Sequence, residues 1–386
     1  MKSTQPCRAA PTGAVGVALQ VKELGRQLGF DLVGITTADP PVHAVQFHQW
    51  IADGFHGEMA YLARRANERV DPTKVLPGAR SVVVVGLNYH TGNAPQPTPA
   101  PKDALRFPSG PGPSGGGESE PTIPSPGGER GVGSARIARY ARGPGDYHQV
   151  MGDRLRSLAE FIGQLGGRAR GYIDTGPVLE RDLAQRGGIG FIGKHTNLIS
   201  RALGNWIFLG ELLTDLELAP DRPEREYCGT CRRCLDACPT RAIVGPYRLD
   251  ARLCISYLTI ELKGSIPMDL RPQIGDRVFG CDDCLEVCPW NRFARLSPVK
   301  EFQRRPLPPL TEYLSWNDAR FREFFRDTPM FRLKRRGFLR NVSVALGNIG
   351  GVSAVPALER ARLDPEPLVR EHAAWARDRI AARDGR

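Results

Sequence analysis

The sequence lacks any long hydrophobic run. No apolar stretch reaches the roughly 20 residues that span a bilayer, and the opening residues, MKSTQPCRAAPTG, contain no hydrophobic stretch of a signal peptide. We therefore expect a cytoplasmic protein with no membrane partner. Hydrophobic residues (41%) and charged residues (25%) are close to the globular average, so the chain as a whole is not a disordered protein. Its 386 residues are enough for two or three domains.

Acidic residues are also scarce relative to basic ones. There are 42 Asp and Glu against 53 Lys and Arg, which gives a formal net charge of +11. This excess favours a polyanionic partner such as a nucleic acid, although charge alone says nothing about fold or chemistry.

Cysteine is nearly absent outside one short region. Of nine cysteines, eight lie between Cys228 and Cys288, and Cys7 is the exception. In a reducing compartment, clustered thiols hold metal more often than they form disulfides. The region therefore predicts a metal site, with Cys7 as a bystander.

The spacing of these cysteines indicates iron–sulfur clusters. The run C-x2-C-x2-C-x3-C-P, typical of bacterial ferredoxins, consists of Cys228, Cys231, Cys234 and Cys238. A second run, C-x2-C-x3-C-P, consists of Cys281, Cys284 and Cys288, and Cys254 lies between the two. Because the last cysteine of such a run binds the other cluster, we expect one [4Fe-4S] cluster on Cys228, Cys231, Cys234 and Cys288. The second cluster would then use Cys238, Cys254, Cys281 and Cys284. The alternative is a pair of zinc sites, which C-x2-C knuckles also suit.

Changes in composition divide the chain into parts. The hydrophobic pattern predicts an α/β domain at 14–220. Its signals are helical spacing over residues 17–28, apolar runs at 32–35 and 81–87, an amphipathic pattern at 155–165, and a strand, turn and helix over 171–185. Residues 1–13 are expected to be disordered, as is a Pro/Gly-rich insertion at 92–133. A ferredoxin-like two-cluster domain at 221–300 would follow. Short helical patterns broken by Gly and Pro at 301–386 resemble HEAT-type repeats, whose concave faces bind extended partners.

Several ordered motifs together resemble the epoxyqueuosine reductases. They are ARYARGPGDYH (138–148), YIDTGPVLER (172–181), GIGFIGKHTNLI (188–199), FLGELL (208–213), CISYLTIE (254–261) and GCDDCLEVCPWNRF (280–293), in addition to the eight cysteines. The resemblance runs from about residue 15 to the end, and the Pro/Gly insertion departs from it. It implies the last step of queuosine synthesis, in which the epoxide of epoxyqueuosine at the wobble position of the tRNA anticodon is reduced with loss of water.

The resemblance also implies cofactors and folds. Cobalamin would bind a nitroreductase-like α/β domain. Two [4Fe-4S] clusters would pass electrons to the cobalamin from a low-potential donor that the sequence does not identify. A HEAT-like domain would help to hold the tRNA. We expect a monomer.

The resemblance assigns roles to particular residues. Asp174 would be the proton donor, with its pKa raised by burial beside the cofactor. The residues expected along the corrin pocket are Arg64, Tyr140, Arg142, Tyr147, Asp174, Lys194, His195, Asn197 and Leu198. No D-x-H-x-x-G motif is present, so we do not expect His195 to bind cobalt. Arg64 could equally contact the tRNA backbone or lie in solvent. The candidates for tRNA contact are Asn291, Arg292, Lys334, Arg335, Arg336 and Arg340, for which a solvated basic face is the alternative.

Two other functions fit parts of the sequence. A corrinoid reductive dehalogenase would share the clusters and the cobalamin, but it acts on small organohalides and does not explain the basic chain with its helical end. A plain electron carrier of the ferredoxin type would not need the long α/β domain with an aspartate at the end of a strand.

Overall fold

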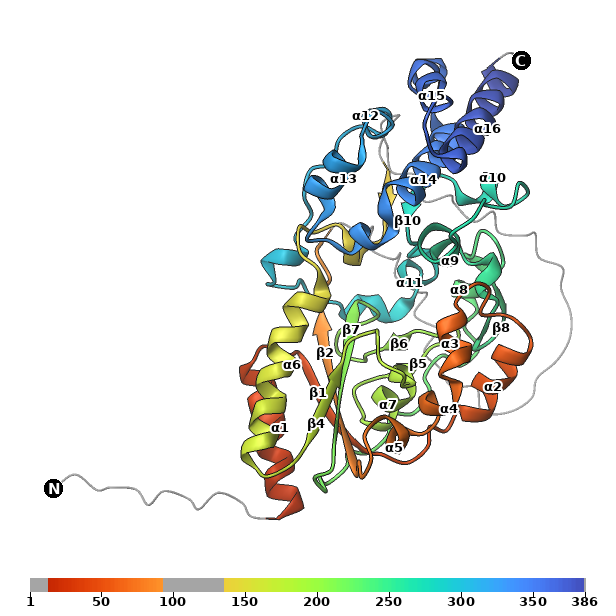
Figure 1. Ribbon diagram of the computed structural model, residues 1–386. Coiled ribbons are helices and arrows are strands. Elements are labelled where there is room, and N and C mark those ends of the chain that lie inside the picture. Colours follow the sequence, from red (N-terminus) through yellow and green to blue (C-terminus); the bar gives the residue numbers. More distant parts are fainter. Residues whose placement is uncertain (1–12, 93–134, 385–386) are drawn as a thin grey trace, which may run out of the picture.

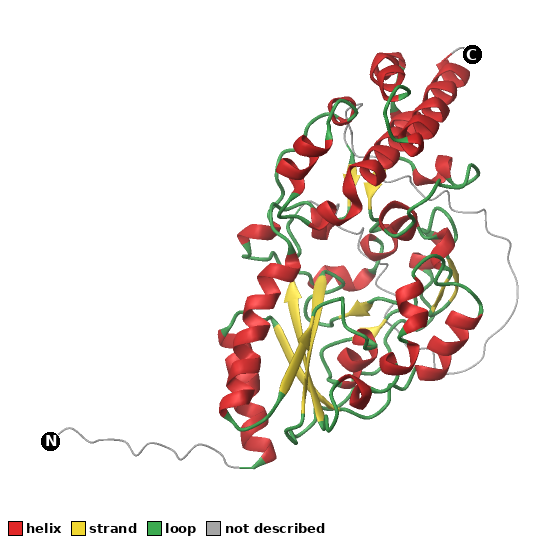
Figure 2. Cartoon of the chain, viewed as in Figure 1, coloured by secondary structure: helices red, strands yellow, loops and turns green. Residues whose placement is uncertain are grey.

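A computed structural model describes residues 13–92 and 135–384 of the chain (Figure 1). The expected disordered terminus and the Pro/Gly insertion lie outside the described residues, apart from their edges. Within these ranges, no helix combines the length and the apolar character that crossing a membrane requires. Helices and a sheet are both present, as the predicted mixed fold class requires (Figure 2).

A four-stranded antiparallel sheet forms the centre of the N-terminal part. Its strands, in spatial order, are β1 (Leu32–Thr37), β2 (Ser81–Asn88), β7 (Ile207–Thr214) and β4 (Ala169–Tyr172). All eight residues of β2 are buried, as expected for a strand covered on both faces. Val83 and Val85 pack into one hydrophobic cluster, and Val82 and Val84 pack into another on the opposite face.

Helices cover both faces of this sheet. Helices α1 (Ala14–Gln27) and α6 (Tyr147–Gln164) lie side by side on one face, and α5 (Pro72–Val75) and α7 (Glu180–Arg186) lie on the other (Figure 1). Helix α6 begins at Tyr147 because the side chain of Asp146 accepts a hydrogen bond from the backbone of His148. The smaller elements of this part are α2 (Ala44–Ala52), α3 (Ala60–Arg64), α4 (Ala66–Arg69), β5 (Phe191–Ile192) and β6 (Leu198–Ile199).

The cysteine region contains little regular structure, as expected. Its helices have four to six residues: α8 (Arg233–Asp236), α9 (Ile255–Ile260), α10 (Arg271–Ile274) and α11 (Asp283–Glu286). Its strands are β8 (Ile243–Gly245), β9 (Arg248–Leu249) and β10 (Arg277–Phe279), and β10 pairs in parallel with β3 (Arg136–Ile137). This pairing joins the cysteine region to the segment that precedes α6.

The C-terminal part is helical. It consists of α12 (Leu310–Tyr313), α13 (Asp318–Phe325), α14 (Lys334–Ile349), α15 (Val355–Ala361) and α16 (Pro367–Asp384). Leu339, Val342 and Leu346 of α14 are buried, as their helical spacing predicts. The hydrophobic cluster around α14 also includes Val278 and Phe279 of β10, so the helical part shares its core with the cysteine region.

Candidate functional site

The eight clustered cysteines fall into two groups in space. Burial raises the pKa of the Cys234 thiol to about 11. The neighbouring thiols that also raise this pKa are Cys228, Cys231 and Cys288. Burial also raises the pKa of the Cys284 thiol, whose thiol neighbours are Cys238, Cys254 and Cys281. The crossing pattern predicts these two sets as the ligands of the two clusters, and that assignment stays a prediction. In the described ranges no three His, Cys, Asp or Glu converge on a single-ion position, whereas the thiolates of a cubane bind separate irons.

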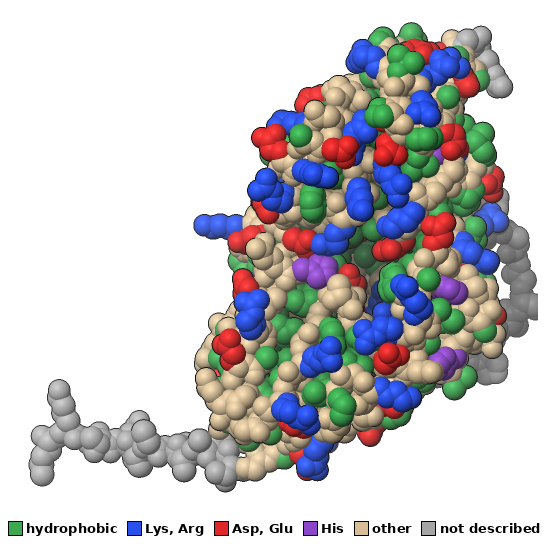
Figure 3. Space-filling view, in the orientation of Figure 1, with side chains coloured by type: hydrophobic (Ala, Val, Ile, Leu, Met, Phe, Trp, Pro, Cys, Tyr) green, Lys and Arg blue, Asp and Glu red, His purple; other side chains and the backbone are tan. Residues whose placement is uncertain are grey.

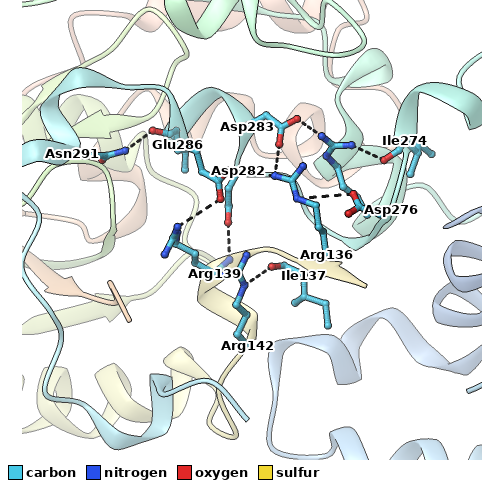
Figure 4. A network of polar contacts seen from close by, with 12 residues as sticks. Arg136, Ile137, Arg139, Arg142, Ile274, Asp276, Asp282, Asp283, Glu286 and Asn291 are labelled. Carbon is cyan, nitrogen blue, oxygen red and sulfur yellow. Dashed lines mark hydrogen bonds and ion pairs between the residues drawn. The ribbon is translucent and has the colours of Figure 1, made fainter. Parts of the chain in front are cut away.

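Carboxylates between the cysteines fix the second cysteine run to β3 (Figure 4). Asp283 accepts a hydrogen bond from Arg136 at 2.7 Å and also pairs with Arg277. Asp282 accepts the backbone N–H of Arg139 at 2.7 Å. Each of these carboxylates therefore has a donor, and together they hold the loop that carries Cys281 and Cys284.

Asp174 lies in a strained turn directly after β4. Its φ is +61°, a left-handed conformation that non-glycine residues rarely adopt outside constrained sites. The turn is held from behind by Arg69, whose guanidinium donates to the carbonyls of Gly176 (3.1 Å) and Val178 (3.3 Å). A Cβ on Gly176 would lie 2.6 Å from the Cβ of Tyr172, so the turn accepts no larger residue there.

Tyr147 connects this aspartate to α6. Its hydroxyl donates a hydrogen bond to Oδ2 of Asp174 at 2.7 Å. Burial, then the charge of Asp174, raises the pKa of Tyr147, so the phenol stays protonated. The ring stacks on Phe208 with a centroid distance of 4.4 Å, and Tyr140 meets it edge-on at 5.9 Å. Two neighbouring aromatic rings therefore fix the Tyr147 hydroxyl that holds the Asp174 carboxyl.

The carboxyl of Asp174 is itself exposed in the structure. The protein alone therefore does not supply the burial that the sequence-based argument requires, and only a bound group could cover this side chain.

Two more carboxyl groups lie near Asp174. Glu211 of β7 is fully buried, and among the described residues neither of its carboxyl oxygens has a hydrogen-bond partner. Burial, then the charges of Glu180 and Asp174, raises its pKa well above the usual range. Burial, then the charge of Asp174, raises the pKa of Glu180 to about 8. Asp174 therefore faces two carboxyl groups whose ionisation is opposed by burial and by its own charge.

A cavity of about 340 Å³ adjoins the same turn. Its lining includes His148, Gly152, Leu155, Ile173 and Thr175. The volume falls in the range of small-molecule sites. Figure 3 shows a hollow in the middle of one face of the molecule, with Lys and Arg side chains on both sides of it.

The other residues expected along the corrin have varied surroundings. Lys194 donates to the carbonyls of Gly229 (2.6 Å) and Cys231 (3.0 Å), so its ammonium supports the first cysteine run. The Nε of Arg142 donates to the carbonyl of Ile137 at 2.7 Å, near the network of Figure 4. Both side chains are thus engaged by the cysteine region or its supporting strand.

The remaining corrin candidates lie on two segments. Burial lowers the pKa of His195 to about 4, so its ring is neutral, and its Nδ1 accepts the backbone N–H of Asn197. Leu198 is buried in β6, and Arg64 is exposed at the end of α3.

The tRNA candidates divide into exposed and engaged residues. Arg292, Lys334 and Arg336 are exposed. Asn291 accepts hydrogen bonds from Asn205 and donates to the carbonyl of Leu285 at 2.6 Å, so its amide is used within the protein.

The prediction of phosphate contacts is wrong for Arg335 and Arg340. Arg335 is buried and paired with Asp364. Arg340 is fully buried and donates to the carbonyls of Leu258, Leu262 and Gly264. Arg335 satisfies an acceptor of the helical part and Arg340 satisfies carbonyls of the cysteine region, so neither guanidinium can reach a phosphate.

Comparison with known proteins decides the family. A curated epoxyqueuosine reductase of Xanthomonas campestris pv. campestris is 40% identical over 377 residues, which cover 96% of this chain and 97% of the relative. The chain belongs to the epoxyqueuosine reductase family. The Escherichia coli reductase is 38% identical over 365 residues, covering 93% of this chain and 88% of that protein. The family is one of oxidoreductases that depend on cobalamin and iron–sulfur clusters.

Family models and solved structures of epoxyqueuosine reductases agree with this assignment. A 4Fe-4S double cluster binding domain matches residues 227–291, and the model of epoxyqueuosine reductase QueG, DUF1730, matches residues 120–175. An epoxyqueuosine reductase solved with an epoxyqueuosine-modified stem loop of tRNA-Tyr has a TM-score of 0.79 and 29% identity, covering 95% of this chain and 90% of that one. A Bacillus subtilis reductase, with its catalytic aspartate loop swung out of the active site, has a TM-score of 0.76, 29% identity and coverage of 94% and 90%.

Sequence reasoning missed several residues of the site. Glu211 interrupts the apolar motif FLGELL, and a charged residue in a buried strand is a detectable signal. Arg332 pairs with Asp146, the N-cap of α6, and its guanidinium lies 5.6 Å from the centre of the Tyr147 ring. No local pattern marks Arg332, because its partners are far away in the sequence.

Proposed function

We propose that this protein reduces epoxyqueuosine to queuosine at the wobble position of a tRNA anticodon. The main support is the hydrogen-bonded pair of Tyr147 and Asp174 beside a cavity. The same chain also contains two sets of four cysteines. The tRNA complex of the related reductase supports the choice of substrate. Such a substrate implies a cytoplasmic reaction.

The residues around Asp174 fit a cobalamin. The cavity has an apolar wall from Leu155 and Ile173, and Gly152 presents no side chain to it. The buried Nε2 of His148 lacks a partner among the described residues and could meet an amide of the corrin. When bound, the cobalamin would supply the two electrons that open the epoxide, after the clusters have passed them on one at a time.

Asp174 acts as the acid in this proposal. The Tyr147 hydroxyl donates to Oδ2, so this hydrogen bond leaves Oδ1 as the carboxyl oxygen that would carry the transferable proton to the departing epoxide oxygen. A corrin and a tRNA loop bound beside the cavity would cover Asp174 and exclude water from it, which favours the protonated form of a carboxyl group. The catalytic aspartate loop of the Bacillus subtilis reductase is swung out of the active site, which is consistent with a strained, exposed Asp174 in this protein.

Anaerobic turnover tests the function. The protein loaded with clusters and cobalamin should convert epoxyqueuosine in tRNA to queuosine, detected as the loss of one oxygen by mass spectrometry of digested nucleosides. Asp174→Asn should lower the rate by about 10²- to 10⁴-fold with intact clusters and bound corrin. Equal rates would assign the proton to another group, and no conversion by the native protein would favour a small-molecule reductase.

We also propose parts for the remaining regions. The helical part around α14 and α16 would be a HEAT-like domain that holds the tRNA, with Arg292, Lys334 and Arg336 on phosphates. The sheet-containing part, 14–220, would be nitroreductase-like, residues 221–300 would carry the clusters, and the protein would work as a monomer with a low-potential electron donor.

The phosphate contacts can be tested with one exposed arginine. Arg336→Glu should weaken tRNA binding and reduce the slope of log K against log salt by about 1. Arg26→Glu, on α1 of the sheet-containing part, is the control and should leave the slope unchanged (Figure 1). Unchanged binding by the Arg336 variant across salt would exclude this contact.

A further inference from the structure

The reduction of an epoxide to an alkene needs more protons than Asp174 can hold. Two electrons and two protons enter, both carbon–oxygen bonds break, a carbon–carbon double bond forms and one water leaves. A single carboxyl group donates one proton, to the oxygen released when the ring opens. The second proton, which lets the hydroxyl leave as water, must come from a group that restores the acid.

We propose that Glu180 and Glu211 form a proton reservoir behind Asp174 that supplies this second proton, an inference that rests on the proposed role of Asp174. Glu180 transfers its proton to the Asp174 carboxylate and becomes a carboxylate itself. Glu211 then restores the proton of Glu180, and solvent restores the reservoir after the product leaves. Electrons come only from the donor and the clusters, so the reservoir moves protons alone.

The position of Glu211 supports this role. It lies on the central strand β7, opposite Tyr172 of β4 in the sheet, and Tyr172 is two residues before Asp174. The Glu211 side chain is fully buried, and both of its oxygens lack partners among the described residues. A buried carboxylate without a cation or donor is far too costly, so the group is held as a neutral acid.

Glu180 interacts electrostatically with both Glu211 and Asp174. It is the first residue of α7, and one of its oxygens is buried without a partner in the described part of the chain. The side chains that face Glu180 are Asp174, Arg69, Arg181 and, from β7, Glu211.

Burial and the charge of Asp174 keep Glu180 protonated at neutral pH. Burial and Asp174 act against its ionisation, and the two arginines do not outweigh them, because its pKa is about 8. Tyr61 also faces Asp174 and Glu180, and its pKa of about 12 keeps it a neutral phenol. A proton therefore resides on Glu180 below about pH 8, next to the acid that has to be restored.

Infrared spectroscopy of the resting protein tests the stored protons. The spectrum of the wild-type holoenzyme at pH 7 should contain protonated carboxyl C=O bands that disappear in Glu180→Gln and in Glu211→Gln. A loss of carboxylate bands in their place would overturn the reservoir, because the groups would then hold no proton to donate. This readout does not depend on turnover.

Single-turnover kinetics tests the transfer. Glu180→Gln and Glu211→Gln should each lower the rate at saturating tRNA by about tenfold or more, with KM unchanged, and the fall in rate at high pH should begin at a lower pH than in wild type. Glu180→Asp should restore part of the rate. The control is Glu261→Gln, which removes another carboxyl group that faces Asp174, from the end of α9.

The outcomes separate this inference from the proposed function. If wild type converts epoxyqueuosine, Asp174→Asn does not, and both glutamine variants match wild type, the reservoir is wrong and the function stands. An equal fall in rate for Glu261→Gln would mean that any carboxyl group facing Asp174 affects the rate through its charge, and it would also overturn the reservoir. Failure of the wild-type protein itself would overturn the proposed function together with the reservoir.

Discussion

The protein contains two sets of buried carboxyl groups that differ in what faces them. Those between the second-run cysteines, Asp282 and Asp283, accept hydrogen bonds from a backbone amide and from arginines (Figure 4). Those near Asp174, Glu180 and Glu211, have buried oxygens without partners among the described residues.

The difference separates a structural use of carboxylates from a chemical one. A paired carboxylate holds the chain in place, and the loss of either partner leaves a buried charge without a counter-charge. An unpaired carboxyl group stabilises nothing and has to be neutral, but it carries a proton that can be donated. Similar residue types thus fix the cysteine loop in one place and hold protons in the other.

The paired set should give the largest effect on stability. Asp283→Asn leaves Arg136 and Arg277 without their shared carboxylate, which should lower the free energy of unfolding by about 3 to 5 kcal/mol. It should also lower the iron content, because the loop between Cys281 and Cys284 loses its anchor. Thermal unfolding under anaerobic conditions and iron analysis measure both.

The control for this variant is an exposed pair. Asp153 and Arg156 on α6 are both largely exposed, so Asp153→Asn should cost about 0 to 1 kcal/mol. Equal effects of the two substitutions would mean that the buried network does not fix the loop. The structural role given to Asp282 and Asp283 would then be wrong.

Tyr147→Phe should give the next largest effect. It removes the hydrogen bond to Oδ2 of Asp174. This bond contributes about 1.5 to 3 kcal/mol once proton transfer leaves Asp174 as a carboxylate, so the rate should fall about tenfold to a hundredfold. Binding of tRNA should change little. Single-turnover rates and tRNA affinity, measured on cluster-loaded protein, separate the two effects.

A matched phenol provides the reference. The buried hydroxyl of Tyr313, in the helical part, has no partner among the described residues, so Tyr313→Phe removes the same group without breaking a bond. If both variants retain the wild-type rate, Tyr147 does not position the acid.

The sequence reveals local features far better than features built from distant segments. The cysteine spacing indicates both clusters because each run of three cysteines is a local loop. The buried strand at Ser81–Asn88 and the helix at Tyr147–Gln164 are equally readable, since periodicity is a local property.

The carboxyl groups around Asp174 come from a turn, a helix start and a strand that only the fold brings together. The error on Arg335 and Arg340 has a related cause. A basic run predicts a charged surface, but α14 places Arg335 and Arg340 on its buried side, where Asp364 and backbone carbonyls accept their hydrogen bonds.

Glu211 gives the smallest expected effect, and its sign is the opposite of that for the paired set. Its pKa is raised in the folded protein, so above its unfolded pKa of about 4.5 the unfolded chain gains stability by ionising while the folded protein does not. Wild-type stability should therefore contain a component that is fully present below this pKa and is lost as pH rises. Glu211→Gln removes that component, because an amide does not ionise.

The variant should unfold at a Tm about 2 to 4 °C higher than wild type at pH 7 to 8, with the difference shrinking toward pH 5. Anaerobic thermal scans at matched rates and equal cluster loading measure this. A Tm lowered at every pH would show that Glu211 is bonded and ionised in the folded protein. It would then belong with Asp283, and the distinction between paired and proton-holding carboxyl groups would fail at the residue on which it depends most.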